Sequence, residues 1–132
     1  MMHPIISGER FLMDAAALLK TATILLALTA VGGIIMAIIR FSGADRPPSW
    51  IAMVHGLIAG SGLTLALYAG LAGTIPSMAW AGIAGLVLAA LGGVYMTLAY
   101  HDKRLPLPKS IVLGHAGIAV VGFLLLAVTA FR

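Results

Sequence analysis

The sequence has very little charge and no cysteine. Only 9% of its 132 residues are charged, whereas 61% are hydrophobic, and the mean hydropathy is +1.10. A soluble domain of this size carries charge on about a quarter of its residues. We therefore expect lipid to be the main solvent of this chain, which excludes a soluble fold. The lack of cysteine excludes disulfides, iron–sulfur clusters and thiolate metal ligands.

Several patterns of chemistry are missing as well. The sequence shows no nucleophile–base pair, no carboxylate dyad and no phosphate-binding loop, so we expect no stand-alone group-transfer enzyme. Any catalysis would be oxidoreduction. The formal charge of +4 does not indicate nucleic-acid binding, because the basic residues fall mostly in two short loops. That distribution is typical of the signals that set membrane topology.

Four apolar segments are present, at about residues 21–39, 50–72, 78–100 and 110–131. Each is long enough to cross about 30 Å of hydrocarbon as a helix. An open sheet edge would leave backbone groups unsatisfied in lipid. The short connections favour antiparallel neighbours, so the sequence predicts an all-α, up-down four-helix transmembrane bundle forming a single domain. Residues 1–20 are expected to be an N-terminal extension or interfacial helix, and Ser49 and Ser77 are expected to be N-caps.

The sequence matches itself when it is shifted by 60 residues without a gap. The aligned positions include a Gly-Gly pair, a loop proline and a histidine: Gly32–Gly33 with Gly92–Gly93, Pro48 with Pro108, and His55 with His115. This coincidence predicts two tandem helical hairpins, at 21–72 and 81–132. Each hairpin has two spans, so both copies enter the membrane in the same direction. They are then related by a pseudo-two-fold axis along the membrane normal.

The repeat places His55 and His115 at one depth on opposite sides of that axis. An ionisable residue inside a membrane span indicates a functional site. For a lone histidine, a neutral ring bonded to a backbone carbonyl is the more common explanation. For a pair facing each other, we favour one b-type haem whose iron is bound by both imidazoles. A zinc site is disfavoured because two histidines alone are too few ligands.

Small residues surround the predicted histidine layer. Six of them are expected to line the haem, although close helix packing would also explain them: Ala59, Gly62, Ala119, Gly122, Gly33 and Gly93. Arg40 and Lys109, at helix ends, are expected to bind the haem propionates. Both are also explained as topology signals. The loops on this side carry more basic residues than the other side, which predicts that they are cytoplasmic and that both termini lie outside.

The helix number and the cross-bundle pair His55 and His115 resemble the cytochrome b561 superfamily. The resemblance covers the architecture of the whole chain and no specific motif. Members with two haems need a second buried histidine pair, which this chain lacks. We therefore do not expect this chain to transfer electrons across the membrane. The resemblance implies a haem-binding electron carrier.

We therefore expect a b-type cytochrome of the bacterial inner membrane, exchanging electrons with a quinone or with a partner redox protein. A second hypothesis is a cofactor-free accessory subunit of a larger respiratory or transport complex. A third is a small transporter with the histidines as a proton relay. We rank it last, because no Asp or Glu lies in the expected spans to pair with them.

Overall fold

The computed structural model describes the backbone of residues 5–132 and the side chains of residues 15–132. This part of the chain forms four α-helices, namely α1 (Ile5–Phe41), α2 (Ser49–Ala72), α3 (Ser77–Met96) and α4 (Lys109–Ala130). A π-helical turn, η1 (Thr97–His101), continues α3. All four helices are long and apolar enough to cross a membrane. The predicted all-helical chain with four candidate spans is confirmed.

Proline determines where the last three helices begin. Pro48, Pro76 and Pro108 occupy the N-cap positions, with φ between −58° and −61° and an extended ψ. The proline ring presets this φ, and the missing N–H is not needed at a helix start. The expectation that Ser49 and Ser77 are N-caps is wrong. Each is instead the first residue of its helix.

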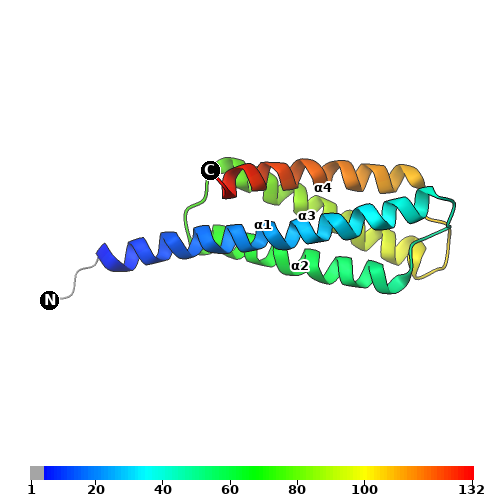
Figure 1. Cartoon of the computed structure of the whole chain (residues 1–132), viewed down its shortest axis with the longest axis horizontal. Helices are drawn as coiled ribbons and strands as arrows, with labels where there is room; N and C mark the ends of the chain where they lie inside the picture. Colours follow the sequence, from blue (N-terminus) through cyan, green and yellow to red (C-terminus); the bar gives the residue numbers. More distant parts are fainter. Residues whose placement is uncertain (1–4) are drawn as a thin grey trace.

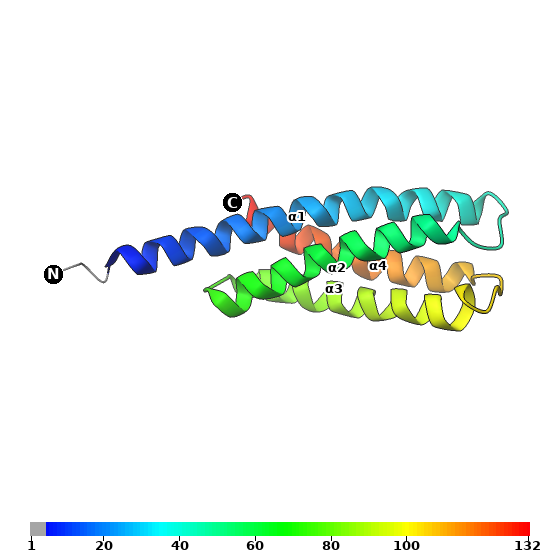
Figure 2. The same ribbon diagram turned by 90° about the horizontal axis from the view of Figure 1, so that it is seen from below.

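Helix α1 is longer than the first predicted span. It runs without interruption from Ile5 to Phe41, so residues 5–20 of the expected N-terminal extension are continuous with that span. Residues 1–4 lie outside the described part of the chain. The start of α1 projects beyond the other three helices (Figures 1 and 2). The first helix therefore has a segment that the bundle does not cover.

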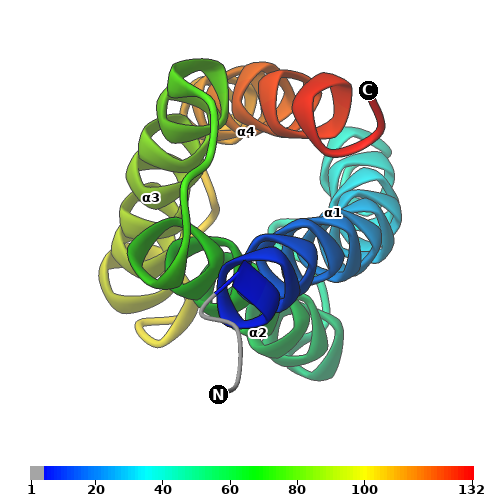
Figure 3. The same cartoon turned by 90° about the vertical axis from the view of Figure 1, so that its left-hand side faces the viewer.

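The four helices lie side by side with their connections at the two ends (Figure 1). The α1–α2 and α3–α4 loops lie at one end, and the α2–α3 connection lies at the other. Viewed along the bundle, the helices occupy four corners, with α2 diagonally opposite α4 (Figure 3). Helix α1 packs mainly on α2, and α3 packs mainly on α4. Two closely packed hairpins therefore meet in two smaller interfaces, between α1 and α4 and between α2 and α3.

The buried core occupies one half of the bundle, away from the α1–α2 and α3–α4 loops. Its largest fully buried side chains are Ile83 and Leu126. The other members of the cluster are Leu19, Ala22, Leu26, Ala66, Ala69, Ala79, Leu86 and Ala130. In the other half, none of the helical residues at 30–41, 49–61, 90–101 and 109–121 is buried. Buried side chains therefore fill only one half of the bundle.

Candidate functional site: the histidine pair

The histidines of α2 and α4 lie in the half of the bundle that lacks buried helical side chains. His55 and His115 each lie six residues after the first residue of their helix, α2 or α4, which is about 9 Å along the axis at 1.5 Å per residue. Both are partly buried. From His55, α2 continues for another 17 residues to Ala72, about 26 Å on the same rise. The pair is therefore much closer to the loop end than to the other end.

Each histidine is held by the neighbouring helix of its own hairpin. Nδ1 of His55 lies 3.0 Å from the carbonyl oxygen of Thr29 on α1. Nδ1 of His115 lies 2.9 Å from the carbonyl oxygen of Ala89 on α3. The two contacts are related by the 60-residue shift found in the sequence. Two hairpins with different side chains thus orient their histidines in the same way.

These hydrogen bonds determine the tautomer of both rings. A carbonyl oxygen only accepts, so Nδ1 must carry the proton and donate it. In a neutral imidazole, Nε2 is then unprotonated and presents a lone pair. A histidine that binds a metal through one nitrogen commonly donates its other N–H to a carbonyl in this manner. Both rings therefore have the protonation pattern of a metal ligand.

The two rings lie close to one another across the diagonal of the bundle. Their centroids are 6.5 Å apart and their planes are inclined by 61°. Two metal–imidazole bonds of about 2 Å, with about 1 Å more from each nitrogen to its ring centre, require a spacing of about 6 Å. An edge-to-face aromatic contact has a similar spacing. The Nδ1–H tautomer leaves an Nε2 lone pair on each ring, so the pair is compatible with metal binding as well as with an edge-to-face contact.

The two Gly-Gly pairs give the imidazoles room against the helix backbone. A Cβ added at Gly33 would lie 3.2 Å from Cε1 of His55, and one at Gly32 would lie 3.6 Å from its Nδ1. At Gly93 and Gly92, the corresponding distances to His115 are 3.5 and 3.6 Å. The glycines therefore contact the histidine of their own hairpin. Their role here is to let each ring reach a backbone carbonyl.

Gly62 and Gly122 serve helix packing. A Cβ at Gly62 would lie 2.9 Å from Cγ of Leu26, and one at Gly122 would lie 2.9 Å from the carbonyl oxygen of Gly82. Both glycines thus allow the two helices of a hairpin to approach closely, as small residues do in membrane bundles. These contacts favour the packing explanation over the lining role expected for both. Ala59 and Ala119 are partly buried, one helical turn beyond the histidines.

The loop end is closed by hydrogen bonds between the two hairpins. Nε of Arg40 donates to the carbonyl oxygen of Leu107 at 2.6 Å, and the amide of Leu107 donates to the carbonyl oxygen of Asp45 at 2.9 Å. Nη1 of Arg46 donates to the carbonyl oxygen of Arg104 at 2.9 Å. Pro47 and Leu107, one in each of the two loops, are buried. The loops therefore cover the end nearest the histidines.

The two residues expected to bind propionates have other contacts in the structure. Arg40 donates from Nε to the carbonyl oxygen of Leu107 and from Nη1 to the carbonyl oxygen of Ala44, the latter at 3.0 Å. Nζ of Lys109 lies 5.3 Å from the centre of the Phe41 ring, within cation–π range. Arg40 thus has a structural role that the sequence did not indicate. Lys109 stays exposed.

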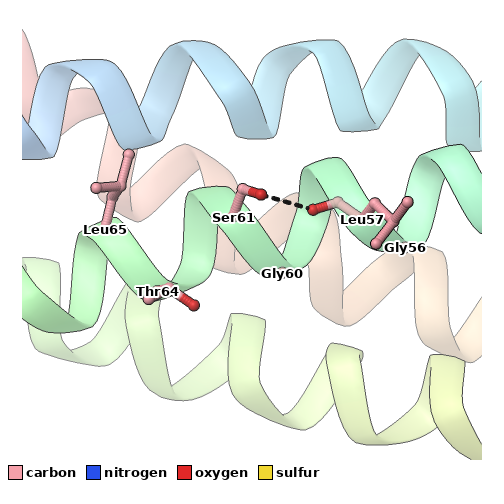
Figure 4. A pocket seen from close by; sticks show the side chains of 6 residues that line it. All are labelled: Gly56, Leu57, Gly60, Ser61, Thr64 and Leu65. Carbon is pink, nitrogen blue, oxygen red and sulfur yellow. Dashed lines mark hydrogen bonds between the residues drawn. The ribbon is translucent and has the colours of Figure 1, made fainter.

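The described part of the chain offers no better site elsewhere. Among the described residues, no group of three or more His, Asp or Glu side chains could hold a metal ion. A shallow hollow of about 570 Å³ runs along α2 (Figure 4), and its lining contains no histidine: Gly56, Leu57, Gly60, Ser61, Thr64 and Leu65. The histidine pair is therefore the candidate site. Comparison with protein-family models, curated proteins and solved structures finds no match.

Proposed function

We propose that this chain is a membrane b-type cytochrome that binds one haem between His55 and His115 and transfers single electrons. The observation that carries the proposal is the tautomer-fixed histidine pair, with ring centroids 6.5 Å apart. We also infer the finer architecture: an up-down bundle of two duplicated hairpins, related by an axis along the membrane normal. The identical histidine–carbonyl contacts in both hairpins support this duplication.

The residues present fit a haem better than a bare metal ion. Two imidazoles supply too few ligands for a tetrahedral zinc site, and the described residues offer no third. A porphyrin brings four nitrogens of its own, so its iron would need only the two imidazoles from the protein. The half of the bundle around the rings has no buried helical side chain. Haem bound there would cover helical side chains that the bundle leaves partly exposed.

The protein's own groups would hold and orient the cofactor. Nε2 of His55 and of His115 would hold the iron, while the carbonyl groups of Thr29 and Ala89 hold the ring orientation through Nδ1. A bound haem supplies reversible one-electron chemistry. Lys109 remains available to a propionate at the loop end, whereas Arg40 would have to leave its present partners. The electron would be exchanged with a quinone or a redox protein.

The pair lies too far from one end of the bundle for a single haem to carry electrons across the membrane. The distances along α2 are about 9 Å to the loop end and about 26 Å to the other end. Tunnelling rates fall exponentially with distance, so exchange should take place at the loop end. Following the excess of basic residues there, we infer that this end faces the cytoplasm of a bacterial-type cell, with both termini outside.

The direct test is the absorption spectrum of the protein purified in detergent. We expect a Soret band, a reduced spectrum typical of two imidazole ligands, and one haem per chain. His55→Ala and His115→Ala should each lose this spectrum. His101→Ala is the matched control, because His101 lies in the η1 turn and its Nε2 contacts Ser49 Oγ at 2.9 Å. Wild-type protein without haem after expression with adequate haem supply would overturn the proposal.

A second candidate, a cofactor-free accessory subunit, is favoured by one observation. Gly56 and Gly60 lie one turn apart on an exposed part of α2, and a Cβ at either would meet nothing within 4 Å. Such a GxxxG pair is a frequent contact between membrane helices. This function predicts that replacing both histidines leaves assembly with a larger complex intact and that no haem is bound.

A further inference from the structure

The loop end of the bundle carries an ordered, positively charged surface. It contains five basic residues (Arg40, Arg46, Lys103, Arg104 and Lys109) and two acidic residues (Asp45 and Asp102), which leaves an excess of three positive charges. Arg40 and Arg46 are engaged by backbone carbonyls of the facing loop. Lys103, Arg104 and Lys109 are exposed. The charge available to a partner therefore comes mainly from the α3–α4 connection.

This connection is held in one conformation by hydrogen bonds. The amides of Arg104 and Leu105 donate to the carbonyl oxygens of His101 and Tyr100, at 3.1 and 2.9 Å. Arg104 adopts φ = 58°, a left-handed conformation that is uncommon for a residue with a side chain. Its carbonyl oxygen accepts from Arg46 of the other hairpin. These bonds join the α3–α4 connection to itself and to the other hairpin, and so position its exposed basic residues.

The charged surface also contains an exposed apolar residue. Leu105 follows Lys103 and Arg104 directly and is 46% exposed. Exposed apolar groups beside charged groups are common in weak electron-transfer interfaces, which are small and depend on electrostatic steering. The surface lies at the end of α2 and α4 nearest the histidine pair. Among the described surfaces, it is therefore the one best placed for electron exchange with a protein in water.

We propose that this surface, formed by Lys103, Arg104, Leu105 and Lys109, docks the acidic face of a soluble one-electron redox protein. The inference rests on the proposed haem between His55 and His115 and names the class of its redox partner. In the productive complex, one electron would pass from the partner's reduced centre to a haem held by the two histidines, so that the partner is oxidised and the haem reduced by one electron each. Opposite charges raise the association rate and make it depend on salt.

The test uses the haem-loaded full chain in a neutral detergent and a reduced, acidic plant-type ferredoxin as probe. Stopped-flow absorption at the Soret band gives the second-order rate constant for haem reduction at several salt concentrations. For Lys103→Gln/Arg104→Gln, we expect a rate constant about tenfold lower than wild type at low salt, with the two converging at high salt. Lys20→Gln/Arg132→Gln, which removes the same charge elsewhere, should behave as wild type.

The possible failures are distinguishable. If the purified protein shows no haem spectrum, the proposed function itself is wrong. If haem is reduced but the rate constant is the same in both charge variants, the docking surface is wrong and the haem site stands. Co-sedimentation with phosphatidylglycerol vesicles tests whether the surface binds anionic lipid instead of a redox protein. Loss of vesicle binding in Lys103→Gln/Arg104→Gln, with an unchanged reduction rate, would assign the surface to anionic lipid and overturn the proposal.

Discussion

The Gly33→Ala variant tests how tightly the His55 ring packs against α1. The added Cβ would lie 3.2 Å from Cε1 of His55, whereas carbon atoms pack best at about 3.5–4.0 Å. The ring must therefore move by about 0.3–0.5 Å to restore normal contact. Movement away from α1 lengthens the 3.0 Å contact from Nδ1 to Thr29 toward the limit of a hydrogen bond.

The expected cost is about 1 kcal/mol, the net value of a typical hydrogen bond. This corresponds to about fivefold weaker haem binding. Gly93→Ala is the matched control in the other hairpin. There the added Cβ would lie 3.5 Å from Cε1 of His115, an ordinary contact distance, so haem binding should change by less than about twofold.

The assay is a titration of the purified apoprotein with haem, followed by the Soret absorbance. Its analysis should compare the dissociation constants of wild type, Gly33→Ala and Gly93→Ala in the same detergent. If Gly93→Ala weakens haem binding while Gly33→Ala does not, the account of how the two glycine pairs seat the histidines is refuted. Equal binding by all three proteins would show that the rings accommodate the methyl group without losing their orientation.

Three further predictions concern helix packing, the loop end and the placement of the haem. Gly62→Ala should destabilise the first hairpin by about 1–3 kcal/mol through overpacking against Leu26, whereas Gly60→Ala should have little effect; thermal unfolding in detergent compares them. Arg40→Gln should lower the unfolding temperature and leave the haem spectrum unchanged. It removes the bond from Nε to Leu107 in the facing loop and the bond from Nη1 to Ala44 in its own hairpin, worth about 1–3 kcal/mol together. Haem should slow amide hydrogen exchange in residues 30–41 and 109–121 more than in the buried core, as measured by mass spectrometry; uniform slowing would contradict the placement of the site.

Much of the fold follows from features that are local in the sequence. The length and apolarity of each span predict a helix, and a proline before a helix predicts its start. The last three helices accordingly begin within one residue of the predicted positions. The π-helical turn after Met96 was missed because it has no local sequence signal comparable to proline. The extension of the first helix was one of the two possibilities for residues 1–20, and α1 runs without a break from Ile5 because charged residues do not by themselves end a helix.

The candidate site was only partly predictable. The 60-residue shift singles out both histidines and both Gly-Gly pairs, and the structure brings each pair of glycines against the histidine of its own hairpin. The hydrogen bonds to Thr29 and Ala89 could not be predicted, because a backbone carbonyl carries no residue-specific signal. The contacts of Arg40 could not be predicted for the same reason. Its partners are the carbonyl groups of Ala44 and Leu107, so the sequence shows only a basic residue at a helix end.

Binding of one iron centre by the two neutral imidazoles is the proposal on which the other predictions rest. Low-temperature electron paramagnetic resonance of the oxidised, haem-loaded protein tests it most directly. The account predicts a low-spin ferric signal from two nitrogen ligands, replaced by a high-spin signal or lost with the haem in His55→Ala and in His115→Ala. A wild-type protein that shows only high-spin haem iron, or the same low-spin signal after both histidines are replaced, would contradict it.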